Sequence, residues 1–93
     1  MPTARLIQVT LGAAATQISA TAAPFNQMNV RNNAAAVARL GDSTVSATKG
    51  IALAAANAAN SEAVIGPFNG MQGDASQYWL FGTAAQLIDV LLT

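Results

Sequence analysis

Hydrophobic and polar residues alternate along several short stretches of the chain. In residues 5–11 the apolar side chains of Ile7, Val9 and Leu11 occupy every second position, and polar residues stand between them. A period of two places such side chains on one face of a β-strand. This stretch therefore predicts a strand that buries one face, and residues 25–32 predict another on the same pattern.

The last stretch, residues 86–93, repeats the alternation with Ile88, Val90 and Leu92 on one face. Only Asp89 interrupts it with a charge. If such an apolar strand lay at the edge of a sheet, its unpaired backbone groups would template aggregation. We therefore expect this strand to be central in a sheet or covered by another chain.

Residues 39–53 organise the middle of the chain as strand, turn and strand. Gly41, Asp42 and Ser43 break an apolar segment, and apolar residues resume after Gly50. Glycine can adopt the positive φ values that tight connections need, and Asp and Ser side chains can bond their own backbone. The stretch predicts two strands joined by an ordered turn.

Two alanine-rich stretches could form either a helix or a strand. Residues 34–40 are too few, between an Asn pair and Gly41, for a stable helix, so they predict a strand. For residues 51–57 a helix remains the alternative. The entry through Gly50, the later Asn residues and the lack of a capping box favour a strand there as well.

Together these patterns predict an all-β, antiparallel β-sandwich of about eight short strands, jelly-roll-like, in a single domain over residues 1–93. Pro67 argues against a central position for the strand that precedes it. The predicted strands lie in residues 5–11, 16–19, 25–32, 34–40, 51–57, 62–68, 77–81 and 86–93.

The charge content narrows the range of partners. Only 9% of the residues are charged, against about 25% in ordinary proteins, and the net charge is zero. The chain offers no basic patch for a phosphate backbone and no polybasic segment for an anionic membrane, so we expect neither nucleic acid nor a membrane as a partner. We also expect no signal peptide and no membrane-spanning segment, because apolar runs are short.

The chain contains no cysteine and no histidine. It therefore lacks disulfides, thiol nucleophiles, the commonest general base and the commonest transition-metal ligand. We expect no enzyme activity, no cofactor and no metal site. Alanine supplies 22 of the 93 residues, so the core of this small domain is expected to be thin.

A few polar residues could still carry chemistry. Asp42 with Ser43 and Thr44 could bind a cation or a sugar hydroxyl, but the alternating acids of a calcium loop are missing, so Asp42 is interpreted as a turn cap. Glu62 and Asp74 could supply the two carboxylates that a glycosidase needs. The sequence does not fix their separation, and hydrolase activity is not expected.

The most aromatic segment could stack on a sugar ring. Strand alternation places Tyr78 and Leu80 on one face, however, and Trp79 and Phe81 on the other. One of these pairs must therefore belong to the core.

Residues 41–51, Gly-Asp-Ser-Thr-Val-Ser-Ala-Thr-Lys-Gly-Ile, resemble a turn of small virion proteins of tailed bacteriophages. The likeness covers most of the chain in order. It includes a Leu-Ile-Gln-Val-Thr strand at residues 6–10, neighbouring asparagines ahead of the turn, and Gly-Pro-Phe at residues 66–68. An aromatic strand, Gly-Thr-Ala and a last Val-rich strand complete it at residues 78–90. The shared pattern is structural rather than catalytic.

The resemblance implies a β-sandwich component of the head or tail of a virion. Capsid decoration (cement) suits a small, sparsely charged, alanine-rich chain best among such roles. Such a protein would bind the outer surface of the major capsid protein lattice where subunits meet, and it would stabilise the head by burying surface across their seams. The alternatives are a tail, neck or fibre component, and a sugar-binding module that acts in host adhesion.

Trp79, Phe81, Leu91 and Leu92 are the candidate interface residues for such contacts. The thin core, the low charge and the apolar last strand also predict a homo-oligomer. A trimer is preferred to a dimer, since it would match the local three-fold positions of an icosahedral shell.

Overall fold

The computed structural model describes residues 4–56, 58–68 and 72–93; residues 1–3 of the predicted domain and residue 57 of a predicted strand lie outside this part. The described chain is all β, with one short 3-10 helix and no α-helix. Its elements are β1 (Arg5–Thr10), β2 (Thr16–Gln17), β3 (Pro24–Phe25), β4 (Met28–Asn32), β5 (Ala38–Gly41), β6 (Ile51–Leu53), β7 (Glu62–Ile65), β8 (Gly73–Asp74), η1 (Ala75–Gln77), β9 (Trp79–Phe81) and β10 (Leu87–Leu92).

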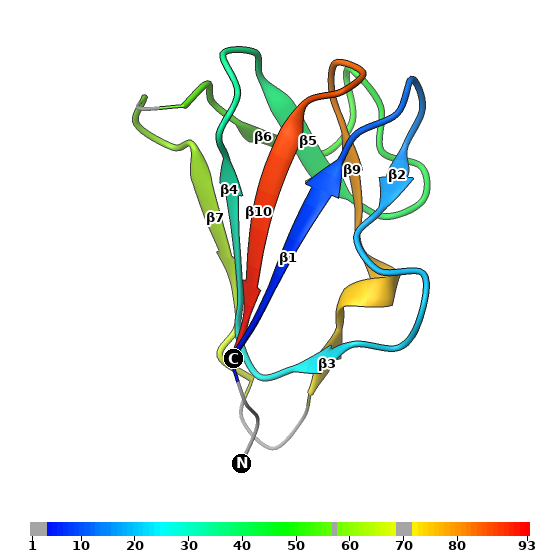
Figure 1. Ribbon diagram of the computed structural model, residues 1–93, viewed down its shortest axis with the longest axis vertical. Helices are drawn as coiled ribbons and strands as arrows, with labels where there is room; N and C mark the ends of the chain where they lie inside the picture. Colours follow the sequence, from blue (N-terminus) through cyan, green and yellow to red (C-terminus); the bar gives the residue numbers. More distant parts are fainter. Residues whose placement is uncertain (1–3, 57, 69–71) are drawn as a thin grey trace.

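Two four-stranded antiparallel sheets form the layers of a sandwich-like fold (Figure 1). The strand order is β1, β10, β4, β7 in the first sheet and β2, β9, β5, β6 in the second, and a small ladder joins β3 to β8. Both sheets contribute to one core, with Met28, Val30 and Val90 from the first and Leu40 and Leu80 from the second. The predicted all-β, antiparallel class is confirmed. The described residues form ten strands, eight of them in the two main sheets.

The alternation predicted the faces of β10 correctly. Ile88, Val90 and Leu92 are buried, whereas Leu87 and Leu91 are exposed. The strand lies between β1 and β4 and pairs with both, so its backbone is satisfied on each side. Its expected central position is confirmed. The last strand therefore needs no second chain to protect it, and this argument for a homo-oligomer is removed.

The predicted strand–turn–strand unit is also present, because β5 and β6 pair antiparallel. Both strands are shorter than predicted, since residues 34–36 form a bend and β6 ends at Leu53. The bend has a local cause: Asn32 Oδ1 accepts from the backbone N–H of Ala34 at 3.0 Å, and Asn32 Nδ2 donates to the carbonyl of Ala36 at 2.7 Å. These bonds hold the segment out of the sheet. The edge position of β7, just ahead of Pro67, fits the proline prediction.

The side chain of Asn32 belongs to a buried amide network at one end of the sandwich. Asn32 is fully buried, and its Nδ2 also approaches the carbonyl oxygens of Leu53 at 3.3 Å and Ala54 at 3.0 Å. Because Asn32 ends β4 in the first sheet and Leu53 ends β6 in the second, these bonds join the two layers directly.

Gln86 completes this amide network. Its Nε2 donates to Asn32 Oδ1 at 3.0 Å and to the carbonyl of Ala36 at 2.8 Å, and its Oε1 accepts from the N–H of Thr83 at 2.9 Å. The turn from β9 into β10 is thereby tied to the ends of β4 and β5. Among the described residues no buried side-chain nitrogen or oxygen lacks a partner, so the network is fully satisfied.

We expect Asn32→Ala to lower the free energy of unfolding by about 2–4 kcal/mol, because it removes the side-chain donor to the carbonyls of Leu53 and Ala54 and the acceptor for Gln86, and it opens a cavity. Urea unfolding followed by circular dichroism measures this loss. Asn33→Ala is the matched control; Asn33 is exposed, and the change should cost about 1 kcal/mol or less. Equal losses in the two variants would contradict a structural role for the network.

Candidate functional site

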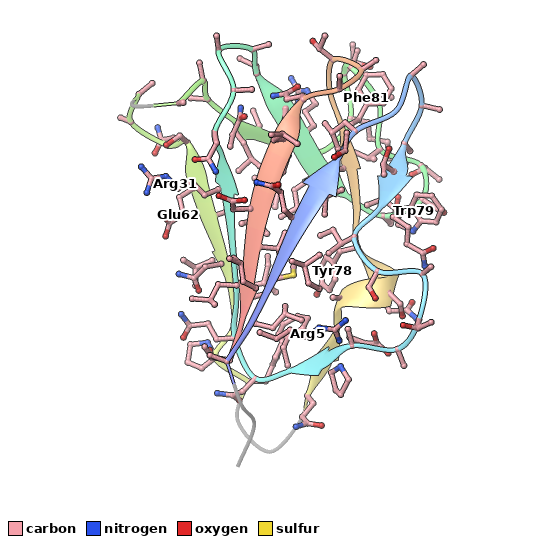
Figure 2. All side chains as sticks on the ribbon, viewed as in Figure 1. Arg5, Arg31, Glu62, Tyr78, Trp79 and Phe81 are labelled. Atoms are coloured by element: carbon pink, nitrogen blue, oxygen red, sulfur yellow. The ribbon has the colours of Figure 1, made fainter. Side chains whose placement is uncertain are left out.

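The residues predicted to form an interface do not share one surface. Trp79 and Phe81 point outward from β9 in the second sheet, on the side opposite buried Leu80, as the alternation predicted (Figure 2). Leu91 points outward from β10 in the first sheet. Leu92 is only 3% exposed and belongs to the core, because every second position of β10 turns inward. Leu92 is therefore removed from the candidate interface, and the others divide between two opposite faces of the sandwich.

The third aromatic residue of this segment packs inward. The ring of Tyr78 lies 6.0 Å from that of Phe25, which in turn lies 5.8 Å from the ring of Phe68. Tilted rings at such separations stabilise a core beyond their buried area. Only Trp79 and Phe81 remain for an outward aromatic surface.

The outer face of the second sheet is partly covered by the loop between β5 and β6. Val45 in this loop is buried against Gly41, which faces outward beside Trp79 in the register of the sheet. A Cβ atom at Gly50 would lie 2.7 Å from the Val45 side chain, and Gly50 has a φ of +131°. Arg39 Nη1 donates to the carbonyl of Gly50 at 2.9 Å. Gly50 therefore allows the loop to pack on the outer face of the sheet, beside Trp79 and Phe81.

Asp42 caps the turn that begins this loop. Its Oδ1 accepts from the backbone N–H of Thr44 at 2.8 Å and also from the Thr44 hydroxyl. These bonds, the hydroxyl bond first, lower the pKa of the Asp42 carboxyl. The turn-cap interpretation is confirmed. Among the described residues no group of three carboxylates or other metal-binding side chains comes together.

Glu62 and Asp74 lie in different sheets, on β7 and β8. Asp74 Oδ1 accepts from the N–H of Ala23 at 2.9 Å and, as the cap of η1, from the N–H of Ser76 at 2.9 Å and its hydroxyl at 2.8 Å. The Ala23 bond above all lowers the pKa of the Asp74 carboxyl. A glycosidase acid needs a raised pKa, so Asp74 is unsuited to that role.

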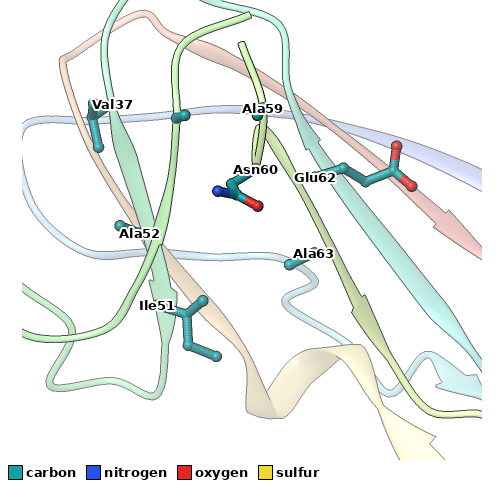
Figure 3. A pocket seen from close by; sticks show the side chains of 8 residues that line it. Val37, Ile51, Ala52, Ala59, Asn60, Glu62 and Ala63 are labelled. Atoms are coloured by element: carbon teal, nitrogen blue, oxygen red, sulfur yellow. The ribbon is translucent and has the colours of Figure 1, made fainter.

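An apolar groove follows the open edge of the sandwich between β6 and β7 (Figure 3). It has a volume of about 520 Å³. Exposed Ile51 and Val37 stand on its second-sheet side, and Figure 3 shows the carboxylate of Glu62 turned away from it. The remaining lining is mostly alanine, with Asn60 as the other polar residue. Such a lining can cover an apolar segment but supplies no reacting group.

The outer face of the first sheet carries exposed apolar side chains that the interface prediction missed, apart from Leu91. Leu6 is 69% exposed and stands directly beside Leu91, and Val64 lies in the same row across the sheet. One feature of the sequence could have indicated this apolar surface: a leucine stands on the otherwise polar face of the first strand. Leu6 breaks the alternation that Gln8 and Thr10 continue.

Comparison with models of known protein families, with curated proteins and with solved structures found no significant match. Within the described residues no helix reaches the length and hydropathy of a membrane span.

The two capped carboxylates predict how stability depends on pH. Because folding lowers the pKa of Asp42 and Asp74 below 3.8, their bonds stabilise the fold above that value. The stabilisation should be lost as pH falls below about 4 and the carboxyls become protonated. Thermal unfolding across this range should show a shallower acid loss in Asp74→Asn than in the unchanged protein.

Ser76→Ala is the graded control for this prediction. It removes one of the three donors to Asp74 and keeps the charge, so its acid profile should lie between the other two. Identical profiles for all three proteins would show that the cap does not couple to folding.

Proposed function

We propose that the chain is a bacteriophage virion structural protein, and that it acts as a capsid decoration (cement) protein on the outer surface of the major capsid protein lattice. It would bind where capsid subunits meet and stabilise the head by burying surface across their seams. The resemblance of residues 41–51, and of the other segments in order, is the reason for naming this class.

The order of the strands carries this proposal furthest. Apart from β3 and β8, eight strands remain in the two main sheets. Among them β1 pairs with β10, β2 with β9, β4 with β7 and β5 with β6, all antiparallel. The pairs are thus nested, from the two ends of the chain towards its middle. A long hairpin rolled into two layers has these pairs, which supports a jelly roll as the finer description of the fold. Viral capsid and lectin domains use this architecture, although such an analogy supports a class and not a specific activity.

We propose the outer face of the second sheet as the contact with the capsid. Trp79 and Phe81 are half-buried there on a short strand, beside Arg39, which pairs with Phe81 in the sheet. Trp and Arg are enriched among the residues that dominate binding energy, and a strand holds them rigidly. We propose no enzyme activity, cofactor or metal.

Two alternative functions are compatible with the same fold and the same aromatic surface. A tail, neck or fibre component could use the same fold and surface at another place in the virion. A sugar-binding module is favoured by one observation, the outward aromatic pair Trp79 and Phe81 on a fold that lectins share. Tyr78 does not join this pair, so a sugar platform would be small.

The number of copies per particle separates the head from the tail. Quantitative mass spectrometry of purified virions should give hundreds of copies for a cement protein. Tens of copies or fewer would instead favour the tail, neck or fibre alternative.

Trp79→Ala should weaken binding of the purified protein to undecorated capsids about tenfold or more, because it removes a central aromatic anchor. Ile51→Ala is the matched control, since Ile51 is exposed but lies at the edge groove rather than on this face. Cosedimentation with capsids measures both. Unchanged binding in Trp79→Ala would place the contact elsewhere, and glycan-array binding lost in the same variant would favour the sugar-binding alternative.

A further inference from the structure

The largest exposed apolar side chains concentrate on one face. Six such residues occur among the described residues, and four of them, Leu6, Val64, Leu87 and Leu91, face outward from the first sheet. Apolar patches of this kind, rimmed by polar groups, mark interaction surfaces.

Polar residues on the same face form a single row across all four strands. Gln8 on β1 pairs with Asp89 on β10, Asp89 with Arg31 on β4, and Arg31 with Glu62 on β7. The neighbouring row runs Leu6, Leu91, Asn29, Val64 in the same strand order. Figure 2 shows Arg31 and Glu62 side by side at the β4–β7 side of this sheet.

We propose that this face binds a second copy of the chain, in a two-fold dimer whose axis runs parallel to the strands between β10 and β4. This axis lays β10 on the partner's β4 and β1 on the partner's β7. Asp89 then faces Arg31 of the partner subunit, and by symmetry the same pair forms twice. Gln8 faces Glu62 of the partner subunit, and Leu6 faces the partner's Val64.

The signs of the charges select this axis. A two-fold axis perpendicular to the strands, along the polar row, would set Asp89, Arg31 and Glu62 each against its own copy, which is repulsive. The same axis shifted between the rows would press Leu91 and Val64 against the carboxylates of the neighbouring row, which is costly because those charges would lose water. The axis along the strands opposes Asp89 to Arg31 and Leu6 to Val64, and it sets Leu91 against Asn29 of the partner subunit. Stacked sheets then keep the usual angle of about −30°.

The size of the face sets the strength of the dimer. Four strands of up to six residues span roughly 20 by 20 Å, so about 800 Å² is buried over both partners. This area is below the roughly 1,000 Å² expected of a stable interface, so the proposed contact is a weak and reversible one. The two-fold arrangement replaces the trimer preferred from the sequence, and it goes beyond the proposed capsid contact, which uses the opposite face.

Charge exchange tests the dimer in the isolated protein. Sedimentation equilibrium should show a reversible dimer for the unchanged chain. Arg31→Asp alone sets Asp89 against the partner's new aspartate, and Asp89→Arg alone sets Arg31 against the partner's new arginine. Each should weaken association about tenfold or more. The double exchange restores unlike pairs and should recover association to within about threefold of the unchanged protein.

A cross-link tests the axis independently of charge. The chain has no native cysteine, so Leu6→Cys with Val64→Cys introduces the only two thiols. Within one chain these positions lie on β1 and β7, three strand spacings or about 14 Å apart. A bismaleimide too short for that span should join two chains in the double variant, but not in either single variant.

Several outcomes would overturn the proposal. In sedimentation equilibrium they are a monomer at about 1 mM, a trimer, or single exchanges without effect. A double exchange that stays dissociated while circular dichroism shows a native fold would do the same. In the cross-linking experiment the contradicting outcome is cross-links in both single variants. None of these outcomes bears on binding to capsids, which is measured separately through Trp79.

Discussion

The buried pair of amides formed by Asn32 and Gln86 is the interaction on which the rest of the structure depends. Asn32 ends a central strand of the first sheet. Its side chain donates to the carbonyl of Ala36, just before β5, and to those of Leu53 and Ala54 at the end of β6, both in the second sheet. Gln86, in the turn before β10, donates to the side chain of Asn32 and to the same Ala36 carbonyl. In a chain so rich in alanine, apolar packing alone specifies sheet alignment weakly, whereas hydrogen bonds in a buried site have one satisfied arrangement. The network therefore fixes how the ends of β4, β5 and β6 and the turn before β10 are aligned.

The two outer faces that result differ in chemistry. The second sheet presents an aromatic pair, Trp79 and Phe81, framed by a loop that Gly50 allows to lie flat against it. The first sheet presents an apolar and a polar row of side chains, with Asp89 and Arg31 as neighbours in the polar row. Because these faces point in opposite directions, the proposed dimer would hold one copy against the shell and its partner on the side away from the shell. The proposed functions of the two faces follow from this difference.

Much of the fold could be predicted from the sequence because strand alternation is a local signal. It gave the faces of β10 and β9, including the separation of Tyr78 from Trp79. It could not reveal that Asn32 is buried, since an Asn pair after a strand is as typical of an exposed turn. The two-residue strands β3 and β8 are too short to show a period. The exposed row on the first sheet depends on which strands are neighbours, and that information is not local.

Electron cryo-microscopy of capsids decorated with the purified protein would show at once where the chain sits and which faces are in contact. A cement protein of this kind should appear as a β-sandwich on the outer surface at junctions between capsid subunits, with Trp79 and Phe81 against the shell and the first sheet turned away from it, towards a second copy. A sandwich that meets the shell through the first sheet, or density for the chain only in the tail, would contradict the proposed role.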